Sequence, residues 1–400
     1  MKPISRRSAL QLLGSAPALA AVPKAKITAI RAIFVGFVYV KVETDAGVFG
    51  VGDGSCSDRD FAVIETIHKH FAPALVGRDP TRIEFIWQDI FRGNFWVAGP
   101  VMQSALSGID MALWDIFGKL AGLPVYRLLG GAARDRVLVY RHVYGKDTEH
   151  LVATARELVA QGHRALRLSP PGGRIFEAAR VIRDSARNMQ AVREAVGDDI
   201  EIAFDAHTRF TPIQAIDLCE RLLPSRPFFV EDPIRAESMY AYRQIRAHTK
   251  APLAAGEQLN HMWEFRELIE EDLVDYLRVD QSHCGGISHA RKIAAMGEAH
   301  HQEMAVHYTG SPVNSAANLH LNLSIPNCAV QEFAPASPPM LEVTPNAYAP
   351  KDGYLEPTEA PGLGLEFNEA AALKIESKLK DKPSHQLLNL RRPDGSVNNW

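Results

Sequence analysis

The strongest pattern in the chain is a series of short apolar runs between Glu201 and Glu332, each ending on a side chain that can bind a metal or carry a proton. Five of these runs lead, in chain order, to Asp205, Glu231, Glu257, Asp280 and His307. By subtraction, the intervals between these residues are 26, 26, 23 and 27 residues. A strand of about five residues, a helix of about twelve and two short loops fill that length. The pattern therefore predicts an α/β fold of consecutive βα units in a parallel barrel, with the polar residues at the strand ends where barrel enzymes build active sites.

The patterning outside this region predicts a second unit. Apolar residues over 35–42 and 48–52 predict a hairpin, and helical spacing over 61–71, 82–91 and 101–120 predicts helices. Residues 26–136 are thus expected to form an α+β domain, and residues 137–345 the barrel, which includes a further short strand ending on Glu332. The chain after residue 345 is irregular and hairpin-like, and residues 346–400 are expected to pack back on the first domain.

Composition narrows the class of protein. With 400 residues, 46% hydrophobic and 23% charged, the chain is long enough for two domains. A net charge of -3 does not indicate the basic surface that nucleic-acid binding requires. The four cysteines lie far apart without a CxxC pair, which favours neither a zinc site nor a disulfide framework. A small-molecule substrate is the expected partner.

The first twenty residues have the features of an export signal. Arg6 and Arg7 precede an apolar run, Ala9 to Ala20, that closes on Ala-Leu-Ala. The paired arginines resemble a twin-arginine signal. Residues 1–20 are therefore predicted to direct the protein to the periplasm, and the protein is cytoplasmic if the signal is not used. The alternative is an amphipathic start of the mature fold. No other apolar stretch approaches membrane-spanning length, so no span is expected in the mature chain.

Three of the strand-end residues predict a metal site. Asp205, Glu231 and Glu257 would converge as hard oxygen ligands, which suit Mg²⁺. Zinc more often recruits histidines. Without a cation, three carboxylates would repel one another and raise their own pKa values.

Two histidines predict acid–base chemistry beside that metal. His307 ends the strand after Asp280, and an Asp–His pair fixes the imidazole tautomer of a general base. His207 lies two residues beyond Asp205, on the same side of an extended strand. One histidine would take the proton α to a metal-bound carboxylate, and the other would protonate a departing β-hydroxyl. A protonated Glu332 would donate a hydrogen bond to the enediolate. The reaction expected is loss of water from a polyhydroxy acid.

Three further residues are candidates for substrate contact. Arg167 lies on the second predicted barrel strand and His142 at the end of the first, with Tyr140 and Tyr144 as neighbours. Trp96 lies in the Gly-bounded segment 93–99, where a capping loop would cover the pocket. For each of the three, a surface or packing role is the alternative.

Several segments resemble the enolase superfamily, in its sugar-acid dehydratase branch. They are Phe204–His207, Val230–Pro233, Ala255–Glu257, Cys284–Ile287 and His307 in the barrel, and 77–80, 108–115 and 124–131 in the first domain. The latter segments and the ending 394–400 are similar to mannonate dehydratase-like, or starvation-sensing, proteins. The resemblance implies a (β/α)7β modified TIM barrel with an α+β capping domain, and Mg²⁺ on Asp205, Glu231 and Glu257. It implies His307 as base with Asp280, His207 as acid and Glu332 as stabiliser of the enediolate. It also implies a homo-oligomer and a 2-keto-3-deoxy acid as product.

The sequence departs from that family pattern at the second barrel strand. Arg167-Leu168-Ser169 stands where many members carry Lys-x-Lys, and the short turn 169–173 lacks the tyrosine of mannonate dehydratases. The expected site thus resembles galactonate or gluconate dehydratase on a mannonate dehydratase-like frame. The alternatives are an epimerase or cycloisomerase of the same superfamily, and a weakly active sensing protein.

Overall fold

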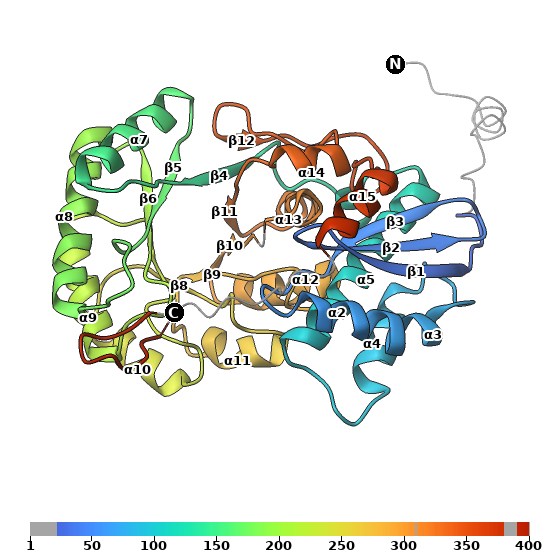
Figure 1. Cartoon of the computed structure of the whole chain (residues 1–400), viewed down its shortest axis with the longest axis horizontal. Coiled ribbons are helices and arrows are strands. Elements are labelled where there is room, and N and C mark those ends of the chain that lie inside the picture. The colour runs from blue at the N-terminus through green and yellow to red at the C-terminus, as the bar shows by residue number, and fades with distance from the viewer. Residues whose placement is uncertain (1–21, 309, 380–389, 400) are drawn as a thin grey trace, which may run out of the picture.

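The computed structural model describes residues 22–308, 310–379 and 390–399. A closed parallel barrel and an N-terminal α+β domain, hereafter the cap, lie side by side (Figure 1). The predicted export signal, residues 1–20, lies outside the described residues.

The cap is an antiparallel sheet of three strands with helices packed against it. Where the sequence predicted a hairpin, the sheet has one strand more, because Gly36, with a φ of +90°, turns the chain between the first two strands. The strands are β1 (Ile27–Phe34), β2 (Val38–Thr44) and β3 (Phe49–Asp53). The helices are α2 (Asp60–Thr66), a π-helical turn η1 (Ile67–Phe71), α3 (Ala72–Leu75), α4 (Ile83–Arg92), α5 (Pro100–Ala121) and α6 (Val125–Leu128).

The long helix α5 approaches β3 at backbone distance. A Cβ atom added to Gly52 would lie 1.9 Å from the carbonyl oxygen of Gly108, and one added to Gly50 would lie 2.0 Å from that of Ala112. Only glycine allows this approach, so the small residues of β3 determine where α5 lies.

The barrel confirms the predicted (β/α)7β architecture. Eight parallel strands pair in chain order from β4 to β11, and β11 pairs with β4 to close the barrel. The strands are β4 (Val137–His142), β5 (Ala165–Leu168), β6 (Glu201–Asp205), β7 (Val230–Glu231), β8 (Leu253–Ala255), β9 (Tyr276–Leu277), β10 (Glu303–Val306) and β11 (Cys328–Glu332). The crossover helices are α7 (Thr148–Ala160), α8 (Ala178–Val196), α9 (Pro212–Leu222) with a 3-10 turn η2 (Leu223–Ser225), α10 (Met239–His248), α11 (Met262–Glu270), α12 (Gly286–Ala299) and α13 (Pro312–Ser324).

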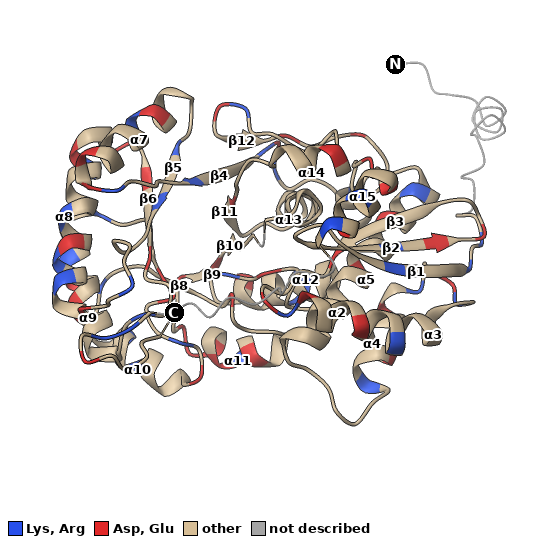
Figure 2. Ribbon diagram, viewed as in Figure 1, with Lys and Arg blue, Asp and Glu red and all other residues tan. Residues whose placement is uncertain are grey.

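Side chains fill the barrel interior and leave its carboxyl end for chemistry. The interior cluster contains Tyr140, Phe229 and Val330 together with alanines of β5, β6, β8 and β10. The outer helices carry charges of both signs on their solvent faces, as Figure 2 shows for α8. No helix in the described ranges is long and apolar enough to cross a bilayer.

The chain after β11 contacts both domains. It contains α14 (Pro338–Val343), β12 (Tyr354–Leu355), which pairs antiparallel with β4, and α15 (Glu369–Leu379), which contacts β1 of the cap. The last described residues, 390–399, form a small hairpin in which Arg391 pairs with Val397. This C-terminal hairpin lies against the barrel, where the amide of Phe176 donates to the carbonyl of Arg391 at 2.7 Å.

Candidate active site

Acidic side chains converge at the carboxyl ends of β7 and β8. One carboxylate oxygen from each of Glu231, Asp232 and Glu257 lies within 4.8 Å of the others. Glu231 and Asp232 are buried, and Glu257 is half-buried. Asp205 lies beside Glu231, because the two residues are register partners on β6 and β7.

The buried carboxylates of this cluster are unfavourable in their ionised form without a bound cation. Burial raises the pKa of Glu231 to about 8, against the opposing Arg278, and the charges of Asp205 and Glu257 add to the rise. Burial, followed by the charges of Glu257 and Glu231, also raises the pKa of Asp232 well above its usual range. Within the described structure, Oε2 of Glu231 and Oδ2 of Asp232 are buried without a hydrogen-bond partner. A hard divalent cation fits this all-oxygen donor set, because it would neutralise the carboxylates and occupy the orphaned oxygens.

The structure places the predicted ligand Asp205 differently from its two companions. Its Oδ2 accepts a hydrogen bond from Nη1 of Arg167 at 2.7 Å, and its Oδ1 accepts one from the amide of His207 at 2.7 Å. Asp205 is therefore in an ion pair with Arg167, and its role as a metal ligand stays a prediction.

Asp232 belongs to the acidic cluster although the sequence reasoning did not select it. Successive strand residues point to opposite faces, so Glu231 and Asp232 were not expected together. The backbone of Asp232 has a φ of +36°, which ends the strand alternation at this point. The acidic dipeptide was visible in the sequence, but this turn was not.

His307 lies between Asp280 and the acidic cluster. Its Nδ1 is 2.5 Å from Oδ2 of Asp280, and its Nε2 is 3.3 Å from Oε2 of Glu257. Burial lowers the pKa of His307, but the charges of Glu257, Glu332 and Asp280 outweigh burial and raise it to about 10. Oδ1 of Asp280 accepts the amide of Ser282 at 2.6 Å, which fixes the carboxylate that orients the imidazole.

Arg278 is a second site residue that the sequence did not lead us to expect. Its guanidinium is fully buried and donates to Glu231 at 2.7 Å, to Glu332 at 2.6 Å and to the carbonyl of Ala305 at 2.6 Å. Arg278 lies two residues before Asp280, so the strand period of two would have placed both side chains on the same face.

Glu332 is a carboxylate in this setting, in contrast to the protonated donor that the sequence hypothesis required. Burial raises its pKa, but the charges of Arg278 and His307 and the hydrogen bond from His142 hold it well below its usual range. Nε2 of His142 lies 2.6 Å from Oε1 of Glu332, and Nη2 of Arg167 lies 3.7 Å from the same oxygen. Two predicted substrate-binding residues therefore contact the site's carboxylates.

The third predicted substrate-binding residue lies apart from these groups. Trp96 is 79% exposed and contacts Phe95 edge-on, with 5.2 Å between ring centroids. A cavity of about 650 Å³ opens beside Glu257, between Cys56 and Ser57 of the cap and the loops after β7 and β8, and Trp96 is not among the residues that line it. Its role in substrate binding stays a prediction.

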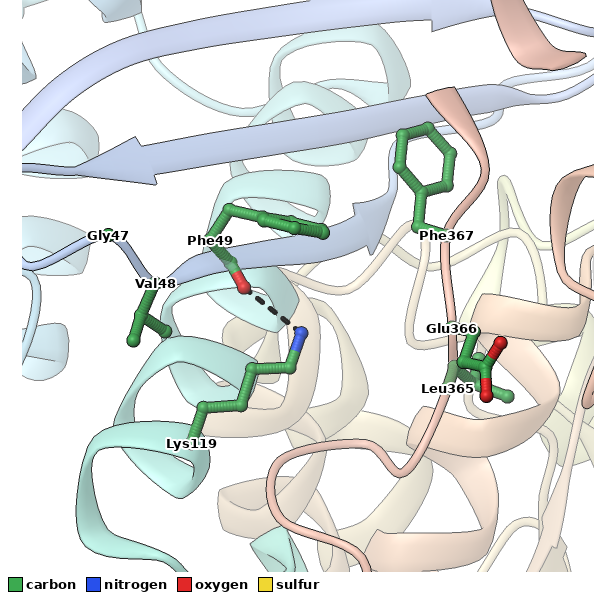
Figure 3. Close-up of a pocket in the computed structure, with 7 residues that line it drawn as sticks. All are labelled: Gly47, Val48, Phe49, Lys119, Leu365, Glu366 and Phe367. Carbon is green, nitrogen blue, oxygen red and sulfur yellow. Dashed lines mark hydrogen bonds between the residues drawn. The ribbon is translucent and has the colours of Figure 1, made fainter. Parts of the chain in front are cut away.

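A second cavity lies between the cap and the C-terminal segment, and it lacks this chemistry. Its volume is about 540 Å³, and its lining includes Phe49, Lys119 and Phe367. Figure 3 shows Lys119 donating to the carbonyl of Phe49 rather than presenting a free charge to the cavity. None of the predicted site residues lines this second cavity, so the cavity beside Glu257 is the candidate entrance to the active site.

Family comparisons match both domains. Residues 150–371 match the enolase C-terminal domain-like family, and residues 22–130 match the mandelate racemase / muconate lactonizing enzyme N-terminal domain. A D-mannonate dehydratase of Caulobacter sp. strain K31 is 41% identical over 391 residues, which cover 91% of this chain and 96% of the relative. A D-galactonate dehydratase family member of Streptomyces bingchenggensis is 38% identical, with 91% and 94% covered.

Solved structures match the whole architecture. An enolase from Pantoea ananatis with bound D-gluconate and Mg superposes with a TM-score of 0.87 at 35% identity. The superposition covers 94% of this chain and 100% of the Pantoea chain. A putative galactarate dehydratase from Agrobacterium radiobacter, with bound Na and L-malate, gives a TM-score of 0.86 at 31% identity, with 94% and 100% covered.

Proposed function

Since this chain belongs to the mandelate racemase / muconate lactonizing enzyme family of the enolase superfamily, in its acid-sugar dehydratase branch, we propose that it is a Mg²⁺-dependent aldonate dehydratase. The product would be a 2-keto-3-deoxy acid. The observation that carries the proposal is the pair of orphaned buried carboxylate oxygens, on Glu231 and Asp232, close to the His307–Asp280 pair.

The metal would be held by carboxylates that the structure brings together. Glu231 and Glu257 would be the central ligands, and Asp232 lies beside them with a second orphaned oxygen. Asp205 would be a further ligand if its carboxylate exchanged Arg167 for the metal. Bound there, the cation would offset the negative charge that develops on a substrate carboxylate when the neighbouring carbon loses its proton.

The proton transfers would be carried out by the two histidines. Asp280 holds Nδ1 of His307. The charge of Glu257 is the largest that raises the pKa of His307, so neutralisation of Glu257 by a bound cation would lower this pKa and leave Nε2 to take the proton from the carbon α to the carboxylate. His207 would give a proton to the β-hydroxyl as its carbon–oxygen bond breaks. One proton is gained by the base, one is lost by the acid, and water leaves. The resulting enol rearranges to the keto acid.

Two arginines would prepare the site for an anionic substrate. Arg167 offers a partly accessible guanidinium beside Asp205 and can transfer its ion pair to a substrate carboxylate. Arg278 keeps Glu332 ionised, so Glu332 acts by holding His142 and Arg278 in place. Glu332 therefore does not serve as the protonated hydrogen-bond donor expected from the sequence.

The nature of the relatives supports aldonates as the substrate class. Their names refer to D-mannonate and D-galactonate, and one structural neighbour holds D-gluconate. All three compounds have the carboxylate, the acidic α-carbon and the β-hydroxyl that the proposed chemistry requires.

An assay of keto-acid formation from a panel of aldonates, with Mg²⁺ and with EDTA, tests the function. We expect product from one or more of D-mannonate, D-galactonate and D-gluconate, loss of activity with EDTA, and restoration by Mg²⁺. His307→Asn should lower turnover by about a hundredfold or more, because it removes the general base. Deuterium uptake from solvent at the α-carbon without keto acid would retain the base and reject dehydration. Absence of both reactions would reject the proposed function.

We also propose that residues 1–20 export the protein to the periplasm and that the mature protein is a homo-oligomer. Cell fractionation of the full-length chain and of an Arg6→Lys, Arg7→Lys variant tests export, since the variant should stay in the cytoplasm. Light scattering of the mature protein tests the oligomer, and the mass of a monomer would contradict it.

A further inference from the structure

The C-terminal hairpin, residues 390–399, connects two loops at the mouth of the barrel. On one side, the amide of Arg391 donates to the carbonyl of Arg174 at 2.8 Å, and the amide of Phe176 donates to the carbonyl of Arg391 at 2.7 Å. These bonds hold the loop after β5. On the other side, Nδ2 of Asn398 donates to the carbonyl of Arg209 at 3.1 Å, in the loop after β6. That second loop carries His207.

Asn398 is built into the hairpin rather than lying loosely on it. The residue is 8% exposed. Its Oδ1 accepts a hydrogen bond from Nε of Arg392 at 3.2 Å, and its backbone amide donates to the carbonyl of Leu390 at 3.0 Å. Leu390 is itself buried in the main core cluster. The side-chain amide of Asn398 is therefore held in a fixed position, from which its Nδ2 donates to the carbonyl of Arg209.

The loop after β6 needs such support, because two consecutive side-chain-bearing residues adopt left-handed backbone. His207 has a φ of +51° and Thr208 a φ of +57°. Non-glycine residues rarely adopt this conformation, and it persists only where surrounding contacts impose it. The loop after β7 supports this segment from within the barrel domain. The amide of Thr208 donates to the carbonyl of Asp232 at 2.7 Å, and Arg209 forms an isolated antiparallel β-bridge with Ile234. Asn398 supplies a contact from outside the barrel.

We propose that Asn398 is a positioning residue for His207, which makes the C-terminal hairpin a functional part of the active site. The inference rests on the proposed function for the identity of His207 as the acid. The bond from Asn398 to the carbonyl of Arg209 adds to the support of segment 207–209 and so helps to set the position of the imidazole. The described side-chain partners of His307 are Asp280, Glu257 and Glu332, none of which lies in the hairpin, so the base step is expected not to depend on it.

The test separates the two histidine-dependent steps in the mature protein with Mg²⁺, using D-gluconate and D-mannonate as probes. Deuterium uptake at the α-carbon reports the base, and keto-acid formation reports the acid. Asn398→Asp keeps an acceptor for Arg392 but cannot donate to Arg209, and Asn398→Ala removes both contacts without burying a charge. Val397→Ala, at a neighbouring exposed side chain, is the matched control.

We expect kcat for keto-acid formation to fall about tenfold in both Asn398 variants, while KM and deuterium uptake change by less than about twofold. The control should match the wild type in both reactions. Equal losses in the two reactions would indicate a purely structural role and overturn the proposal, as would unchanged dehydration in both Asn398 variants.

Crystal structures of the variants give a readout that does not need activity. In Asn398→Asp and Asn398→Ala, His207 and Thr208 should leave the left-handed conformation, while in Val397→Ala they should keep it. An unmoved segment in both Asn398 variants overturns the inference. If the wild-type protein catalyses neither reaction, the proposed function fails, and the structures alone decide whether Asn398 positions His207.

Discussion

At the scale of single residues, Arg278 holds two carboxylates of the site with one buried guanidinium. It contacts Glu231, a proposed metal ligand, and Glu332, which in turn contacts His142. A buried charge is stable only when its partners are present, and removing one partner leaves the others uncompensated. Arg278 is therefore expected to support both the fold and the metal site.

Replacing Arg278 by Met tests this expectation. The variant keeps much of the side-chain volume but leaves Glu231 and Glu332 without their cation, so the free energy of unfolding should fall by about 3–5 kcal/mol. Affinity for Mg²⁺ should also change, and urea unfolding together with metal titration measures both. Arg221→Met, which breaks an exposed ion pair with Asp217, should cost less than about 1 kcal/mol. Equal effects of the two substitutions would contradict the assigned role.

His320 on α13 predicts a pH dependence of stability. It is fully buried, and burial lowers its pKa from 6.5 to about 4. Its Nδ1 accepts the amide of Tyr126 at 3.2 Å, which requires that nitrogen to be unprotonated. In the unfolded chain His320 binds a proton below about pH 6.5, whereas the folded chain binds it only near pH 4. The stability associated with neutral His320 is thus present above pH 6.5 and is lost as the pH falls toward 4.

His320→Asn isolates this contribution, because the amide oxygen can still accept from Tyr126 but does not titrate. Between pH 7 and pH 5 the wild type should lose about 2 kcal/mol more than the variant. Denaturant unfolding at several pH values provides the measurement. A difference between the two proteins that stays constant with pH would show that His320 is not held neutral by the fold.

At the scale of elements, the sequence predicts the barrel well because its signal is periodic. Apolar runs about one βα unit apart determine strand order, and in a parallel barrel strand order alone brings the carboxyl ends to one rim. The prediction that Glu231, Glu257, Asp280 and His307 meet at that rim therefore needed no knowledge of the loops. The match of His307 with Asp280 follows from the pairing of adjacent strands.

The parts that were missed depend on backbone angles and distant contacts, which periodicity does not encode. Asp232 joins the acidic cluster through a positive φ, and the first cap strand is separated from the second by a turn at Gly36. The ion pair of Arg167 with Asp205 joins residues 38 positions apart. The place of the C-terminal hairpin depends on contacts between Asn398 and a loop 189 positions earlier.

The contact between β3 and α5 yields a prediction for the cap. Gly52→Ala would place a methyl group against the carbonyl of Gly108, and a backbone atom cannot rotate away as a side chain does. The helix must shift, so we expect the free energy of unfolding to fall by about 1–3 kcal/mol or more. Gly172→Ala is the matched control, since an added Cβ there meets nothing within 4 Å and its φ is not left-handed. Thermal unfolding of both variants checks the prediction, and a Gly52 variant as stable as the control would contradict it.

At the scale of the whole molecule, the cap and the barrel meet at the segment that follows Asp280. Nε1 of Trp87 donates to the carbonyl of Gly285 at 2.8 Å, and the amide of Gly285 donates to Oγ of Ser107 at 2.9 Å. The amide of Ser288, in the first turn of α12, donates to Oδ2 of Asp110 at 3.0 Å. The cap thus holds the start of α12, a few residues from the carboxylate that orients His307.

Asp110 is the place to test whether this docking supports the site. Burial raises its pKa to about 7, so a neutral acceptor is already well populated at neutral pH. Asp110→Asn should therefore retain the bond to Ser288 and behave nearly as the wild type. Asp110→Ala leaves the buried amide of Ser288 without a partner, which costs about 1–3 kcal/mol.

We expect the alanine variant to show faster proteolysis between cap and barrel, around residues 131–136. We also expect a higher KM for the aldonate, because the cap supplies one wall of the cavity beside Glu257. If the asparagine variant is impaired as strongly as the alanine variant, the charge of Asp110 matters rather than its hydrogen bond, and the docking argument fails at this residue.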